Sequence, residues 1–180
     1  GTFMKAGIAY IPEDRNREGV VGDMAVWENA VLSETGNAAL VGGISQIDKR
    51  ACLAQAERIC ANNDVRTQSL AQPARLLSGG NVQKLLIGRW LARKPGIIIA
   101  CQPSRGLDEG AISAGHRMLL AARQDGSAIL LISEDLEEIM ALTDRIAVMF
   151  DGRLSSPLPN YAIDPVELGL MMTGEGFHAV

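Results

Sequence analysis

Three apolar runs of strand length constrain the fold of this chain more than any other feature of its sequence. They are residues 97–101 (IIIAC), 128–133 (AILLIS) and 145–150 (RIAVMF), and segments with helical spacing, 109–124 and 135–143, separate them. Apolar runs without polar alternation are typical of strands buried on both faces, which favours a parallel sheet in an α/β fold. We therefore expect the three runs to lie parallel and adjacent in one sheet.

The first half of the chain predicts a strand and a mostly helical region. Residues 7–12 (GIAYIP) read as a strand that ends at Pro12, and a charged, glycine-containing loop follows. Residues 46–63 have the spacing of an amphipathic helix. The sheet would then lack a first βα unit, so we expect an incomplete domain. Its expected parts are a helical lobe at about 24–93, an α/β core at 94–160 and a C-terminal tail at 161–180.

Composition excludes several classes of function. The 180 residues suit one domain, and a net charge of -4 with only 4% aromatic residues disfavours a nucleic-acid partner. Three cysteines without a CxxC pair are typical of a reduced, cytoplasmic protein. No apolar run approaches the ~20 residues that span a bilayer, so any membrane role is expected to depend on a partner.

The ends of the predicted strands are the first places to look for a site, because ligands bind at the carboxyl ends of strands in parallel α/β sheets. Residues 101–102 and 133–134 occupy those positions. The first pair is Cys101 and Gln102, a thiol and an amide without charge, directly before a Pro-Ser-Arg-Gly turn.

Residues 76–90 (LLSGGNVQKLLIGRW) predict a second site at the start of a helix. Ser78 can cap this helix, and Gly79 and Gly80 leave its first backbone N–H groups uncovered. Free N–H groups at the positive end of a helix dipole form a ready anion site. For Ser-Gly-Gly alone, a plain N-cap after a loop is the alternative.

Several motifs in order resemble the nucleotide-binding domain of ABC transporters, from about residue 7 to the end. The family's signature motif, Leu-Ser-Gly-Gly followed by a glutamine, is matched by Leu77, Ser78, Gly79, Gly80 and Gln83. Its D-loop is matched by Gly106, Leu107 and Asp108, after the strand where the family has its Walker B motif. Glu13 stands where the Q-loop glutamine usually lies.

The stretches AYIPEDRNREGVV, SEDLEEI and ELGLMMTG narrow the resemblance to the second half of the tandem ATPase subunits of bacterial nucleoside and simple-sugar importers. This resemblance implies ATP and Mg²⁺ in the intact transporter, and the first nucleotide-binding domain and permease subunits as partners. It also implies a cytoplasmic place at the inner face of the membrane. The sequence contains no G-x-x-x-x-G-K-[ST] loop, which the family carries upstream, so no tightly bound cofactor is expected.

Compared with the family pattern, three positions lack the residue that binds Mg²⁺ or takes part in hydrolysis. Cys101 stands where an aspartate helps to hold Mg²⁺, Gln102 where a glutamate polarises the attacking water, and Glu134 where a histidine touches the γ-phosphate. A thiol is a poor ligand for a hard cation, and an amide cannot accept the proton of water. We therefore expect a half-site that does not hydrolyse ATP, in a fragment that is inactive alone.

Other interpretations stay open. Cys101 can be an ordinary core residue, and Glu134 can simply favour the N-terminus of the following helix. A non-enzymatic dimerisation or regulatory module is one alternative, although it would not need the glycines of the signature. A thiol enzyme based on Cys101 is another, but no His–Asp pair accompanies that cysteine. No metal site is expected, and His116 and His178 lack the neighbours that a catalytic role requires.

Overall fold

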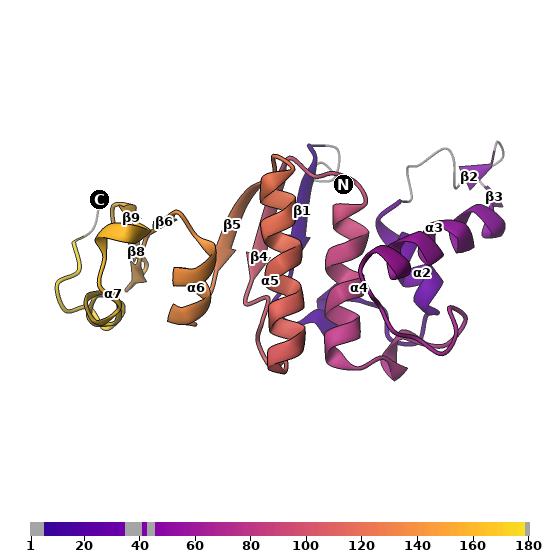
Figure 1. Ribbon diagram of the computed structural model, residues 1–180, viewed down its shortest axis with the longest axis horizontal. Coiled ribbons are helices and arrows are strands. Elements are labelled where there is room, and N and C mark those ends of the chain that lie inside the picture. The colour runs from indigo at the N-terminus through magenta and orange to yellow at the C-terminus, as the bar shows by residue number, and fades with distance from the viewer. Residues whose placement is uncertain (1–5, 35–40, 43–45, 179–180) are drawn as a thin grey trace. The chain divides into compact units, whose positions relative to one another are not determined.

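The computed structural model describes residues 6–34, 41–42 and 46–178 (Figure 1). The chain forms two compact units, Gly1–Ile132 and Ser133–Val180, and each is considered by itself. The three-part division expected from the sequence stays a prediction. Within the described ranges, no helix is both long and apolar enough to cross a bilayer.

A three-stranded parallel sheet forms the centre of the first unit. Its strands are β1 (Ile8–Ile11), β4 (Ile97–Cys101) and β5 (Ala128–Ile132), in the order β1-β4-β5. Ile8 pairs with Ile97, and Ile97 pairs with Ala128, so the strand nearest the N-terminus joins the sheet beside β4. The expected parallel pairing of residues 97–101 with the run at 128–133 is confirmed.

Two helices, α4 (Gly79–Leu91) and α5 (Glu109–Gln124), cover one face of this sheet and lie side by side (Figure 1). The residues of β1 and β4 that face them are completely buried, and Leu86 and Ile87 from α4 and Leu119 from α5 pack against them. These sheet residues are Ala9, Ile11, Ile98 and Ala100. This packing fixes the position of the first turn of α4 relative to the end of β4.

The opposite face of the sheet is open, which corrects the expectation that both faces are buried. Tyr10, Ile97, Leu130 and Ile132 point to this face and are 44–55% exposed. Register explains why they share it, because Tyr10 aligns with Ile99 and Leu130, and side chains alternate along each strand. The two continuous apolar runs of the first unit therefore identified β4 and β5 correctly, but among the described residues of this unit only one face is covered.

Short helices and a hairpin form the rest of the first unit. They are the π-helix η1 (Arg15–Gly19), α2 (Val26–Val31), η2 (Leu32–Glu34), β2 (Val41–Gly42), β3 (Gln46–Ile47), α3 (Lys49–Asn62) and η3 (Ala74–Leu76). Val26 and Ala30 from α2 and Ile59 from α3 pack with Leu85 of α4 in an apolar cluster. The helix expected at residues 46–63 is confirmed as α3, with Asp48 capping it by accepting from the Ala51 N–H at 3.0 Å.

The second unit shows that the prediction for residues 145–150 was wrong. This run is not a third parallel strand: it divides into β6 (Arg145–Ile146) and β7 (Met149–Phe150), each in a two-stranded antiparallel sheet. The partner of β7 is β8 (Arg153–Leu154), and the partner of β6 is β9 (Leu158–Pro159). Asp151 and Gly152 have φ of 46° and 70°, the left-handed geometry of a tight hairpin turn, so the chain turns back after Phe150.

Three helices complete the second unit: α6 (Leu136–Leu142), η4 (Asn160–Ala162) and α7 (Pro165–Met172). Its own apolar cluster is formed by Ile146, Val148, Ile163, Leu168 and Met171. Asn160 supports the cluster from its edge by donating to the carbonyls of Met140 and Thr143 at 2.7 and 2.8 Å.

Candidate functional site

The N-terminus of α4, formed by Ser78, Gly79 and Gly80, is open. Ser78 occupies the N-cap with an extended backbone, but its hydroxyl accepts a hydrogen bond from Asn81 Nδ2 at 2.8 Å. Within the described chain no side chain caps this helix. The first N–H groups of a helix have no partner inside it, and together with the helix dipole they favour an anion.

Both glycines of this N-terminus are required by close neighbours. A Cβ atom at Gly80 would lie 2.8 Å from the Cβ of Ala111 in the first turn of α5. A Cβ atom at Gly79 would lie 3.1 Å from Arg15 Nη2 and 3.6 Å from Leu107 Cδ2. The glycines therefore let α4 approach both α5 and the loop that precedes α5.

The loop after β4 has an unusual backbone at the position that follows Cys101. Gln102 has a φ of 47°, and its N–H donates to the Ile132 carbonyl at 2.8 Å, which continues the β4–β5 pairing by one bond. A left-handed backbone at a residue other than glycine is often associated with a functional site. Four residues later Gly106 has a φ of 67°. Asp108 ends the loop and caps α5 by accepting from the Ala111 N–H at 2.9 Å.

Side chains from two other elements hold the carbonyls of residues 103–108, which we call the D-loop segment. Arg15 donates from Nη1 to the Arg105 carbonyl at 2.7 Å and from Nη2 to the Gly106 carbonyl at 3.2 Å. Gln83 from α4 donates to the Pro103 carbonyl at 2.7 Å, and its side chain is almost fully buried. The D-loop segment is therefore hydrogen-bonded to η1 through Arg15 and to α4 through Gln83.

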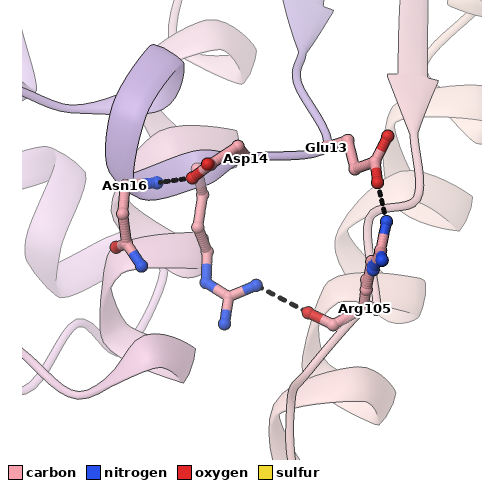
Figure 2. A pocket seen from close by; sticks show the side chains of 5 residues that line it. Glu13, Asp14, Asn16 and Arg105 are labelled. Carbon is pink, nitrogen blue, oxygen red and sulfur yellow. Dashed lines mark hydrogen bonds and ion pairs between the residues drawn. The ribbon is translucent and has the colours of Figure 1, made fainter.

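A hollow of about 320 Å³ opens beside this segment, lined by Glu13, Asp14, Arg15, Asn16 and Arg105. Figure 2 shows Glu13 and Arg105 facing each other across it as an ion pair, while Asp14 accepts from the Asn16 N–H. Both partners of the ion pair are half-exposed, so its contribution to stability is small. Two acidic side chains, two basic side chains and one amide line the hollow, which makes it a polar junction between the start of η1 and the D-loop segment.

A second hollow, of about 570 Å³, lies in front of the α4 N-terminus. It is lined by Arg66, Thr67, Gln68, Gln72, Leu76, Leu77 and Ser78. Near this hollow in sequence, the Lys84 ammonium of α4 donates to Asp64 at 2.9 Å and lowers the pKa of that carboxyl. Arg66 also lowers this pKa, and its N–H donates to Asn81 at 2.8 Å.

Cys101 lies on the open face of the sheet. Partial desolvation raises the pKa of the neighbouring Tyr10 phenol, and a hydrogen bond between Cys101 and this phenol raises it further. The thiol is half-buried, and within the described residues no cluster of three or more His, Cys, Asp or Glu could hold a metal ion. The end of β4 thus presents sulfur and amide groups where a metal site would need carboxylates.

The predicted site residues of the first unit lie just after β1, at the end of β4 and in the D-loop segment, and at the start of α4. Gly79 and Gly106 lie beside Arg15, Leu107 lies beside Gly79, and Glu13 pairs with Arg105. Leu77 and Ser78 line the second hollow, whereas Gln83 is buried against the D-loop segment. Glu134 belongs to the second compact unit, in the turn before α6, where Asp135 caps the helix.

Sequence reasoning missed Arg15 and Arg105. Arg15 is the first residue of the short helix η1 and Arg105 lies in the D-loop segment, and neither position stands out in a single sequence. The available signal was the stretch PEDR after the first strand, in which an arginine follows two acidic residues at a strand end. That signal predicts a charged loop but not its partner.

Curated relatives resemble nearly the whole chain. The guanosine import ATP-binding protein NupO of Bacillus subtilis (strain 168) is 42% identical over 170 residues, covering 94% of this chain and 33% of that protein. The glucose import ATP-binding protein TsgD13 of Haloferax volcanii is 38% identical, with 97% and 32% covered. The ribose import ATP-binding protein RbsA 1 of Agrobacterium fabrum is 34% identical, with 95% and 33% covered. The chain thus spans about a third of the length of these relatives, and no family model matches it.

Solved structures resemble the fold. The dimeric post-hydrolysis state of the ATP-binding cassette MJ0796 bound to ADP and Pi has a TM-score of 0.67 at 19% identity, covering 85% of this chain and 62% of that one. A nucleotide-free ATP-binding cassette from an ABC transporter has a TM-score of 0.65 at 20% identity, with 88% and 63% covered. The expected α/β fold, part of an ATP-binding cassette, is confirmed.

Proposed function

We propose that this chain is most of the second nucleotide-binding domain of the ATP-binding subunit of an ABC importer for nucleosides or simple sugars. The relatives named above are import ATP-binding proteins for guanosine, glucose and ribose, and they resemble this chain over almost its whole length. The observation that carries the proposal is the open N-terminus of α4 at Ser78, Gly79 and Gly80, placed on a cassette fold.

The α4 N-terminus would serve the ATP that the first nucleotide-binding domain of the same subunit holds. Its uncovered N–H groups and the Ser78 hydroxyl would donate to the γ-phosphate. Their fixed direction matters most when charge develops during transfer, because oriented donors then stabilise charge without rearranging. Gly79 and Gly80 let this N-terminus lie close to Arg15 and Ala111, which sets the direction in which its N–H groups point.

The chain's own half-site would bind nucleotide at most. Magnesium does not fit the residues present, because Cys101 offers a thiol beside the Tyr10 phenol and Gln102 offers an amide. Gln102 can orient a water molecule but cannot accept its proton, and losing a general base costs roughly 10²–10⁴ in rate. Glu134 would place a negative charge where the family has a histidine. ATP and Mg²⁺ in the intact transporter would therefore react at the site completed by the signature.

The partners that follow from this proposal are the first nucleotide-binding domain and the transmembrane permease subunits. The assembled subunit would lie at the inner face of the membrane, attached through the permease. ATP hydrolysis would then drive solute import, with this chain contributing the signature rather than the hydrolytic groups.

Solute-stimulated ATPase of the intact transporter tests the proposal. Ser78→Arg and Gly79→Asp should each lower turnover by about 10²–10³-fold, since each blocks oriented donors. Gln102→Ala should change turnover little. Gly96→Asp is a matched control, because a side chain at Gly96 meets open space. Near-normal turnover for the first two variants, with a collapse for Gln102→Ala, would contradict the proposal. It would show that ATP is hydrolysed at this chain's own half-site. Normal turnover for all four would favour the dimerisation module.

A further inference from the structure

One guanidinium joins three segments of the first unit that are far apart in sequence. Arg15 starts η1, directly after the β1 loop, and its two terminal nitrogens bond the carbonyls of Arg105 and Gly106. The same Nη2 atom also lies close to Gly79: if Gly79 had a Cβ atom, the two atoms would be only 3.1 Å apart. Arg15 is therefore hydrogen-bonded to the D-loop segment and lies beside the α4 N-terminus, with no room for a side chain larger than hydrogen at Gly79 unless Arg15 moves.

The turn that carries Arg15 is held rigidly. Asp14 accepts from the N–H groups of Asn16 and Arg17 at 3.2 and 3.1 Å, and Val20 donates to the Arg15 carbonyl at 3.0 Å. At the other end of η1, Arg89 of α4 donates to the Gly19 carbonyl at 2.6 Å. The backbone around Arg15 is thus fixed to α4 independently of the Arg15 side chain.

The bonds that Arg15 makes are of the strong kind. A charged donor forms stronger hydrogen bonds than a neutral one, and the planar guanidinium can meet two adjacent carbonyls at once. A lysine would keep the charge but could not reproduce this two-pronged geometry. The D-loop segment depends on such bonds, because Gly106 is left-handed and the segment lies outside any helix or strand.

We propose that Arg15 is a positioning residue that holds the D-loop segment and the α4 N-terminus in one arrangement, so that both reach the partner domain's nucleotide together. This role rests on the proposed function, but the coupling of the two segments is a property of this chain alone. Arg15 acts through its neighbours and not by touching the reacting atoms.

Hydrogen exchange of the full-length subunit, read by mass spectrometry, tests the coupling without any turnover. Arg15→Gln should speed exchange about tenfold in peptides that cover residues 103–108, and also at the start of α4. Arg15→Lys should fall between the wild type and Arg15→Gln. Arg17→Gln is the matched control, because Arg17 lies on the same turn with an exposed side chain. Equal exchange in Arg15→Gln and Arg17→Gln would overturn the proposal.

A double-mutant cycle in the intact transporter tests the positioning role. Arg15→Gln should lower the kcat of the solute-stimulated ATPase several-fold with little change in the KM for ATP. Gly79→Ala should cost several-fold in the wild type, but little more in the Arg15→Gln background, because glutamine lacks the guanidinium nitrogens that the new Cβ atom would displace. Additive effects would refute the role of Arg15. If Ser78→Arg leaves turnover normal, the proposed function fails, and the exchange result still decides whether Arg15 couples the two segments.

Discussion

The contact between Gly80 and Ala111 permits a sharp test of the packing of the first unit. Replacing Gly80 with alanine places a Cβ atom 2.8 Å from the Ala111 Cβ, which is anchored to a helix backbone and cannot swing away. Overpacking of this kind costs about 1–3 kcal/mol, and the better helix propensity of alanine returns at most ~1 kcal/mol. We expect Gly80→Ala to destabilise the first unit by about 1–2 kcal/mol, a shift of the urea midpoint of roughly 0.5–1 M.

The compensating exchange makes this prediction specific. Ala111→Gly alone should also cost about 1–2 kcal/mol, through lost propensity and a lost buried methyl group. The double variant, Gly80→Ala with Ala111→Gly, moves one methyl group from α5 to α4 and should return to within ~0.5 kcal/mol of the wild type. Tryptophan fluorescence during urea unfolding is the assay, since both tryptophans, Trp27 and Trp90, lie in the first unit. Additive costs in the double variant would refute the contact.

Four further predictions concern this chain alone. It should show no ATPase turnover above a buffer blank and at most weak ATP binding, because it lacks a phosphate-binding loop; clear turnover in protein free of contaminating ATPases would contradict this. Burial raises the pKa of the Cys60 thiol to about 11, so maleimide at neutral pH should label the half-buried Cys101 well before Cys60. Because this pKa is raised in the folded state, the contribution of Cys60 to the free energy of unfolding should be constant below about pH 9 and decline toward pH 11. Cys60→Val should remove that decline in urea titrations at different pH values. Lys94→Gly should stabilise the first unit by ~0.5–1 kcal/mol in the fluorescence assay, because exposed Lys94 has a φ of 49° that glycine adopts freely; a loss of stability would count against this reasoning.

Residues 97–101 and 128–132 could be predicted because their signal is local. An uninterrupted apolar run between turn residues predicts a strand, and a helical segment of 16 residues between two such runs leaves few alternatives to a parallel pair. The run at 145–150 carried the same apolar signal, yet the Asp-Gly pair after it specifies a hairpin. Turn chemistry decided the pairing there, and it was readable in the sequence.

The candidate site divides in the same way. The α4 N-terminus was readable, because a serine and two glycines before an apolar helical pattern describe a single local structure. The contacts of Arg15 were not readable, because its carbonyl partners lie about 90 residues away and their direction depends on the left-handed Gly106. The burial of Gln83 likewise depends on how close the D-loop segment approaches α4.

The order of strands in the central sheet has a consequence for how the chain is made. β1 must wait for β4, whose residues leave the ribosome roughly 90 positions later, or about 5–20 s at ordinary rates of synthesis. Pairing β4 with β5 closes a much shorter loop and therefore loses less conformational entropy, so we expect the β4–α5–β5 segment to form first. β1 would then be added as an edge strand. In pulse-labelled refolding, the amides of β1 should therefore be the last of the sheet to gain protection. Until then, its apolar side chains are available to chaperones or to other nascent chains.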